Sequence, residues 1–184
     1  MTVLKNLFAV VMLCACAGVA GASVIVMDNG DVGYSENGGS WWHGTDGYQD
    51  DQAAILDGVG ANATYQFDGL TPGDYYVRTT YVNAGNRNTA VPYTMIDGTA
   101  ASGSELGTVY VNQKYTPPSG YSYDGWEWDE LGTFSITGST LTVRIDVVPG
   151  EGFSMCDGVM IEAVPEPVTM GLLLVGLPLL VRRR

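Results

Sequence analysis

The stretch Leu141-Thr-Val-Arg-Ile-Asp-Val147 separates apolar and polar residues completely by parity. Successive side chains of a β-strand point to opposite faces of a sheet, so this pattern predicts a strand with one buried and one solvated side. Ala63-Thr-Tyr-Gln-Phe67 and Tyr75-Tyr-Val-Arg-Thr-Thr-Tyr81 alternate in the same way. The turn-forming residues between them, 68–74, predict that these two strands pair as antiparallel neighbours with one wet face.

Further strands are predicted at residues 24–28, 92–97, 107–112, 133–136 and 159–163, with Gly, Pro, Asn and Asp between them. Helix has little room, and a single helical turn is predicted between Asp50 and Leu56. The fold class is therefore all-β: one antiparallel, jelly-roll-like β-sandwich of about eight strands over residues 23–163. An N-terminal signal helix (1–22) and a C-terminal hydrophobic helix (164–184) are predicted to flank it.

Composition and charge exclude several classes of protein. A hydrophobic content of 46% excludes a fully disordered chain, and 25 Gly and 11 Tyr disfavour a helical bundle. Residues 23–163 contain four basic and 19 acidic residues, a net charge of −15. Nucleic-acid affinity depends largely on Lys and Arg, so no nucleic-acid partner is expected. Cations and neutral sugars are the better candidates.

The N-terminal segment has the order of a secretory signal. Lys5 precedes an apolar run from Leu7 to Val19, and the small residues Ala20-Gly-Ala22 close it. This pattern predicts removal by signal peptidase after Ala22, and the run is short for a membrane span. A lipoprotein box at Leu13-Cys-Ala-Cys16 is the alternative. Either interpretation predicts export from the cytoplasm.

The C-terminal segment has three parts in order: Pro165, Glu166 and Pro167, then the uncharged run 168–181, then Arg182, Arg183 and Arg184. As a helix the run would rise about 21 Å, short of a hydrocarbon core of about 30 Å, so only transient membrane insertion is expected. This tail resembles the bacterial PEP-CTERM sorting signal. The resemblance implies recognition by an exosortase-type transpeptidase, removal of the tail, and delivery to the cell surface or extracellular matrix. An ordinary C-terminal anchor, the alternative, would also place the domain outside.

Few residues offer catalytic chemistry. Once the signal is removed, Cys156 is alone, and a small buried side chain is the expected role. His43 is the one histidine, so nucleophilic triads and zinc sites lack their usual groups. Glu127-Trp-Asp-Glu130 could supply an acid and a base for glycoside cleavage, but such runs are more often solvated faces. A non-catalytic protein is therefore expected.

The sequence requires no cofactor, and calcium is the candidate that it offers. Asp28, Asn29 and Asp31 follow the first predicted strand, and Asp157 precedes the last. If these strands lie side by side, hard oxygen ligands meet at one place, and extracellular calcium suffices to fill weak sites. The alternative is a turn over 28–31 whose side chains hydrogen-bond to their own backbone.

A series of motifs spans the whole predicted domain. In chain order they are Val26-Met-Asp-Asn-Gly-Asp31, Gly39-Ser-Trp41, Ala63-Thr-Tyr-Gln-Phe67, Pro72-Gly-Asp-Tyr-Tyr-Val77, Val109-Tyr-Val-Asn-Gln113, Trp128-Asp-Glu-Leu-Gly-Thr-Phe134 and Asp157-Gly-Val159. Their order and spacing are similar to the golvesin C-terminal-like domain, which also occurs beside xanthan lyase catalytic regions as a carbohydrate-binding module. The resemblance implies a jelly-roll-like sandwich with an accessory, often glycan-associated role. The closing Cys156-Asp-Gly158 departs from the usual Ala-Asp-Ala, which affects packing more than class.

Aromatic residues in Gly-rich loops supply candidate glycan contacts. Sugar C–H faces pack on rings while hydroxyls need polar partners, and both are present in the stretches 41–48 and 121–128. By the family pattern Trp41 is the core member of its pair. The predicted glycan-binding residues are therefore Trp42, Tyr48, Tyr123 and Trp126, the alternative being that these rings cap the sandwich ends.

Together these features predict a non-catalytic, secreted protein of the cell surface or extracellular matrix that binds a polysaccharide. A structural matrix protein without a specific glycan is the first alternative. A polysaccharide-cleaving enzyme is the second.

Overall fold

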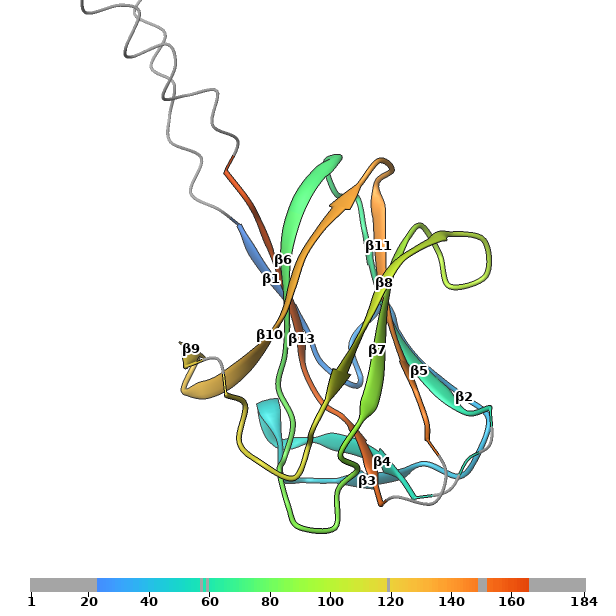
Figure 1. Cartoon of the computed structure of the whole chain (residues 1–184), viewed down its shortest axis with the longest axis vertical. Coiled ribbons are helices and arrows are strands. Elements are labelled where there is room, and N and C mark those ends of the chain that lie inside the picture. The colour runs from blue at the N-terminus through green and yellow to red at the C-terminus, as the bar shows by residue number, and fades with distance from the viewer. Residues whose placement is uncertain (1–22, 57, 59, 119, 149–151, 166–184) are drawn as a thin grey trace, which may run out of the picture. The chain divides into compact units, whose positions relative to one another are not determined.

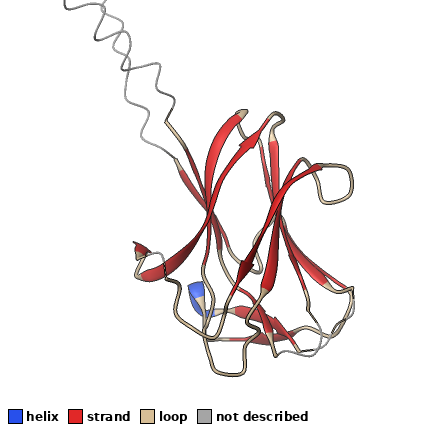
Figure 2. Cartoon of the chain, viewed as in Figure 1, coloured by secondary structure: helices blue, strands red, loops and turns tan. Residues whose placement is uncertain are grey.

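The computed structural model describes residues 23–56, 58, 60–118, 120–148 and 152–165. In these residues the regular structure consists of thirteen strands and one short 3-10 turn, joined by loops (Figures 1 and 2). The all-β prediction is confirmed. All eight predicted strands are present, although their ends differ by several residues in places. Five short strands, β2, β3, β4, β9 and β12, were not predicted.

Two antiparallel five-stranded sheets form the layers of a sandwich, on the left and right of Figure 1. The first sheet has the order β1 (Val24–Met27), β13 (Val159–Ala163), β6 (Gly73–Thr79), β10 (Trp126–Ile136) and β9 (Tyr121–Tyr123). The second has the order β2 (Tyr34–Asn37), β5 (Asn62–Asp68), β11 (Thr140–Asp146), β7 (Val91–Asp97) and β8 (Ser104–Val111). A three-stranded sheet of β12 (Ser154–Cys156), β4 (Gln52–Ile55) and β3 (Trp42–Gly44) lies at one end.

The core lies between the two large sheets. Leu141, Val143 and Ile145 of β11 are fully buried, as their alternation predicts. They belong to one apolar cluster with Tyr65 of β5 and Val77 of β6. Burying side chains of this size contributes about 1.5–3 kcal/mol each, which makes this cluster the main stabilising feature of the domain.

The predicted pairing of residues 63–67 with 75–81 is wrong. β5 pairs with β2 and β11, whereas β6 pairs with β10 and β13. The turn between them therefore carries the chain from one sheet to the other. Both strands have an apolar inner face, and these faces meet across the core. Alternation defines which side of a strand is buried but not which strand lies beside it.

The predicted helical turn between Asp50 and Leu56 is also wrong. Gln52–Ile55 is strand β4, in which all four residues are buried. A 3-10 turn, η1 (Tyr48–Asp50), comes just before it. A short apolar run cannot be assigned to helix or strand by periodicity alone, and here pairing with β3 and β12 decides for strand.

The predicted export and sorting segments fall almost wholly outside the described residues. Residues 1–22 and 166–184, including Glu166, Pro167, Arg182, Arg183 and Arg184, are not described, and exposed Pro165 is the last residue that is. Among the described residues, no helix is long and apolar enough to cross a membrane.

Candidate carbohydrate-binding cleft

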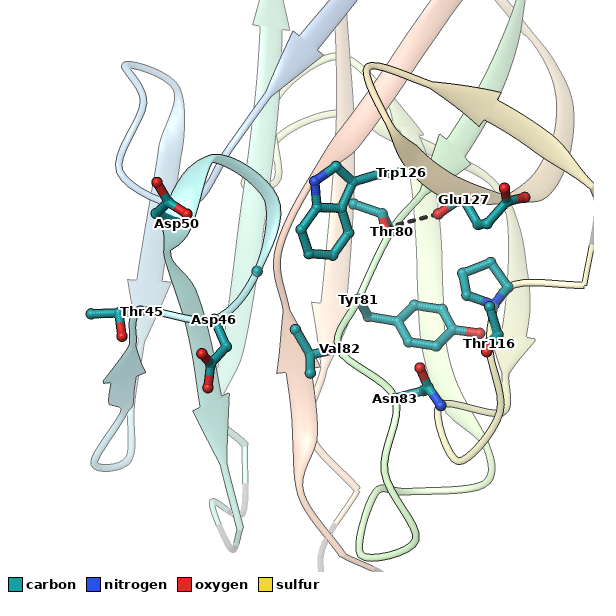
Figure 3. Close-up of a pocket in the computed structure, with 12 residues that line it drawn as sticks. Thr45, Asp46, Asp50, Thr80, Tyr81, Val82, Asn83, Thr116, Trp126 and Glu127 are labelled. Carbon is teal, nitrogen blue, oxygen red and sulfur yellow. Dashed lines mark hydrogen bonds between the residues drawn. The ribbon is translucent and has the colours of Figure 1, made fainter.

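A cleft of about 480 Å³ opens where loops from distant parts of the chain meet (Figure 3). The β3–β4 connection provides one wall, and the segment after β6 provides another. Thr116 and Pro117 of the β8–β9 connection and the first residues of β10 complete it. Its lining residues are Thr45, Asp46, Gly47, Asp50, Thr80, Tyr81, Val82, Asn83, Thr116, Pro117, Trp126 and Glu127.

Trp126 is the large aromatic side chain of the cleft and is partly exposed. Tyr48 packs edge-on against its ring, with centroids 6.3 Å apart, and against Trp128 at 5.3 Å. Tyr48 is only 4% exposed, and its hydroxyl donates a hydrogen bond to Asp124 Oδ2 at 3.3 Å. Tyr48 therefore packs against the Trp126 ring and, being buried, does not offer a face of its own to a ligand.

Polar groups lie around this ring. The Thr80 hydroxyl donates to the Glu127 carbonyl oxygen at 2.9 Å, which ties the segment after β6 to β10 (Figure 3). The carboxyl groups of Asp46 and Asp50 and the amide of Asn83 also line the cleft. An aromatic face beside acceptors and an amide suits a sugar, because hydroxyl groups can donate to the carboxylates while a C–H face packs on the ring.

The other predicted glycan-binding residues lie elsewhere. Tyr123 is 37% exposed and pairs with Trp126 across β9 and β10, so it stands beside the cleft. Trp42 is 53% exposed, but it lies on β3 with its ring over Gly44 and does not line the cleft. Trp41 packs against the core, with its Nε1 donating to the Gly38 carbonyl oxygen, as the family pattern implies.

Several lining residues escaped the sequence analysis. Tyr81 and Asn83 follow β6, and Thr116 lies in a connection between strands. Burial raises the pKa of Tyr81, whose hydroxyl donates to the Asn112 carbonyl oxygen at 3.4 Å. Of these residues, the sequence pattern singles out Tyr81, which lies two residues beyond the end of β6 on the same side of the alternation as Tyr75 and Val77.

An acidic cluster lies next to the cleft and consists of Asp28, Asp51 and Asp157 together with Asn29. Asp28, Asn29 and Asp157 were predicted to lie together, whereas Asp51, from the β3–β4 connection, was not predicted. The Asp31 side chain stabilises the turn over residues 28–31, because its Oδ2 accepts a hydrogen bond from the Asp28 backbone N–H at 2.8 Å. The Asp157 Oδ1 atom accepts from the Tyr48 backbone N–H at 2.9 Å, which anchors the wall of the cleft to this group.

The electrostatics of this acidic cluster are unfavourable as it stands. Burial and the neighbouring carboxylates raise the pKa of Asp157 to about 8, and the same two causes raise the pKa of Asp28. Three of the buried side-chain oxygens that have no hydrogen-bond partner in the described part of the chain belong to this cluster: Asn29 Oδ1, Asp51 Oδ1 and Asp157 Oδ2. Buried carboxylate oxygens without a hydrogen-bond partner are costly, so either a proton or a cation would stabilise them.

The oxygen donors of these residues are of the kind that a hard divalent cation such as calcium prefers. Asp28, Asp51, Asp157 and Asn29 would hold it through carboxylate and amide oxygens, and the ion would supply the positive charge that the cluster lacks. In the described part of the chain, no three His, Cys, Asp or Glu side chains are already gathered as a metal site. A cation would therefore need the Asn29 amide or main-chain oxygens as well as the carboxylates.

Comparison with known proteins gives the fold its context. No protein-family model and no curated protein matches the chain. Among solved structures, a Paenibacillus xanthan lyase superposes with a TM-score of 0.60 at 23% identity, covering 77% of this chain and 13% of the lyase. A family 35 carbohydrate-binding module from Clostridium thermocellum superposes with a TM-score of 0.52 at 12% identity, covering 78% of this chain and 100% of the module. A second structure of such a module from that organism gives 0.51 at 16% identity, covering 76% and 98%.

The chain has the fold of a carbohydrate-binding module. The expected likeness to a domain of xanthan lyase is found in the fold, over a small part of that enzyme. At these identities the likeness concerns the fold alone.

Proposed function

We propose that this protein is a non-catalytic glycan-binding protein of the cell surface or extracellular matrix. The observation that carries the proposal is the cleft, in which the Trp126 ring, packed against Tyr48, is accompanied by polar lining residues. A fold shared with family 35 carbohydrate-binding modules supports it.

The charges of the cleft favour a neutral glycan. Asp46, Asp50 and Glu127 are among its 12 lining residues, and none of the 12 is Lys or Arg. A polyanionic glycan would meet carboxylates without a cationic partner, whereas the hydroxyl groups of a neutral sugar can donate to them.

The arrangement of the carboxyl groups supports a binding role over hydrolysis. Glu127 faces the cleft, and its Oε1 atom accepts from the Ser122 hydroxyl. Asp129 and Glu130 line a separate groove, and Glu130 pairs with Arg78 at 3.4 Å. The run 127–130 is thus divided between two places and is partly engaged in bonds with the protein.

The termini complete the proposal. Residues 1–22 direct export and are removed by signal peptidase, and the tail 164–184 inserts transiently in the membrane until an exosortase-type transpeptidase cleaves it. Mass spectrometry of the protein from the cell surface tests this step: termini near Ser23 and Val164 are expected, whereas an intact chain would refute it.

Binding of the purified protein to a glycan array, followed by titration of the hits, tests the function. Trp126→Ala is expected to weaken binding about tenfold or more, because it removes the stacking face. Trp42→Ala removes a more exposed tryptophan that lies outside the cleft, so it is the control and should bind normally. Absence of all glycan binding would favour the structural matrix protein, and release of reducing ends from a bound polysaccharide would identify an enzyme.

A further inference from the structure

A second groove of about 380 Å³ lies on the flank of the sandwich. It is bounded by β8 on one sheet and by β10 on the other. β8 is the outermost strand of its sheet, and β9 covers β10 only over Trp126–Trp128. The groove is therefore open along two strand edges, with the buried side chain of Leu131 at its floor.

Two tyrosines line this groove, and they are the most exposed aromatic side chains of the described residues. Tyr110 is 69% exposed and Tyr115 is 70% exposed. Tyr110 belongs to β8, whereas Tyr115 belongs to the connection that follows it. Other tyrosines of this chain, such as Tyr65 and Tyr93, are fully buried and gain the free energy of burial. Two exposed rings beside one groove lack this gain, and such exposure is typical of a contact surface.

Acceptor groups accompany the rings. Asp129 and Glu130 both line the groove from β10, and because the Glu130 carboxylate pairs with Arg78, Asp129 is the acceptor left for a ligand. Asp129 is partly buried, and this burial raises the pKa of its carboxyl. The groove thus repeats the combination found in the cleft, an aromatic face beside a carboxylate acceptor without a Lys or Arg among its lining residues.

The groove and the cleft are adjacent. Thr116 lines both, Pro117 lines the cleft and Pro118 lines the groove, so a single loop forms the ridge between them. On β10, Glu127 lines the cleft and Asp129 lines the groove. Residues two apart on a strand are separated by about 7 Å, a distance that a few linked sugar units span.

We propose that the groove is a second sugar subsite and that the ligand is an extended neutral oligosaccharide chain, bound along its length across the Thr116 ridge. This inference rests on the proposed function. The Trp126 cleft holds one part of the chain, and Tyr110 and Tyr115 hold the next units. Joining two subsites on one ligand raises affinity without any change at the first.

Calorimetric titration of the full chain with ladders of neutral cello-, laminari-, xylo- and manno-oligosaccharides, from disaccharide to hexasaccharide, tests the inference. Affinity for the ladder that binds is expected to rise about tenfold or more with length. Tyr110→Ala combined with Tyr115→Ala should abolish this rise and leave disaccharide affinity unchanged. Tyr110→Phe with Tyr115→Phe should restore it, because the stacking faces remain.

The outcomes separate the two proposals. Trp126→Ala should weaken binding of every length, and Trp42→Ala of none. Length-independent affinity, or a double tyrosine-to-alanine variant that binds the hexasaccharide normally while Trp126→Ala does not, overturns the second subsite alone. Failure of every ladder to bind overturns the proposed function and the subsite with it. Both tyrosines are exposed, so an unchanged unfolding midpoint would confirm that the variants fold.

Discussion

The acidic cluster behind the cleft makes stability depend on pH in an unusual direction. The pKa of Asp157 is about 8 in the folded protein against an ordinary value of 3.8. Between these values the folded state holds a proton that the unfolded state has released. Stability without metal is therefore expected to fall as pH rises from about 4 to about 8, and to level off above that.

The size of the effect follows from the same pKa. Each tenfold change in proton affinity corresponds to about 1.4 kcal/mol, so ionising Asp157 costs the folded state on the order of 5 kcal/mol at pH 8. Asp157→Asn removes this charge, and its amide oxygen can still accept from the Tyr48 backbone N–H. In chelator at pH 8 the variant should be several kcal/mol more stable than the native protein.

Urea unfolding at pH 5, 6.5 and 8 in chelator measures this prediction. The native protein should lose stability across the series, while the Asp157→Asn variant should lose much less. Asp46→Asn is the matched control, because Asp46 is exposed and its removal changes the net charge equally. If the variant follows the native pH dependence, the buried carboxyl is not the cause, and the electrostatic argument for the cluster fails.

Calcium is expected to raise the stability of the native protein more at pH 8 than at pH 5.5, because protons compete for the same oxygens. The Asp157→Asn variant should be almost unaffected by calcium. Calorimetric unfolding midpoints with calcium and with chelator measure both effects. Gly47→Ala should unfold more easily by about 2 kcal/mol and bind glycans weakly, because its Cβ would lie 1.9 Å from the Asp51 carbonyl oxygen; urea unfolding and titration measure both. Arg78→Met should cost about 2 kcal/mol in urea unfolding, because the buried guanidinium pairs with Glu162 at 2.9 Å. Cys156 is fully buried, so its thiol should react with a thiol reagent only when the protein unfolds. Rapid reaction of the folded protein would contradict this burial.

The sequence predicted the types of residue that form the site, but it did not predict the position of every one of them. The sequence placed Asp28 and Asp157 together because the first and last strands were expected to be neighbours, and β1 does pair with β13. It missed Asp51, which joins them only because β4 lies at the same end. It also chose Tyr48 as an exposed ring, although packing on Trp128 buries it.

The sequence by itself determined the class of the fold and the inner face of each long strand. Residues 141–147 bury their odd-numbered side chains because alternation is a local property of the extended backbone. Only the tertiary structure decided that β5 and β6 lie in opposite sheets, and that the groove lined by Tyr110 and Tyr115 adjoins the cleft lined by Trp126. Strand partners and loop neighbours depend on contacts between residues far apart in the chain, which no local pattern encodes.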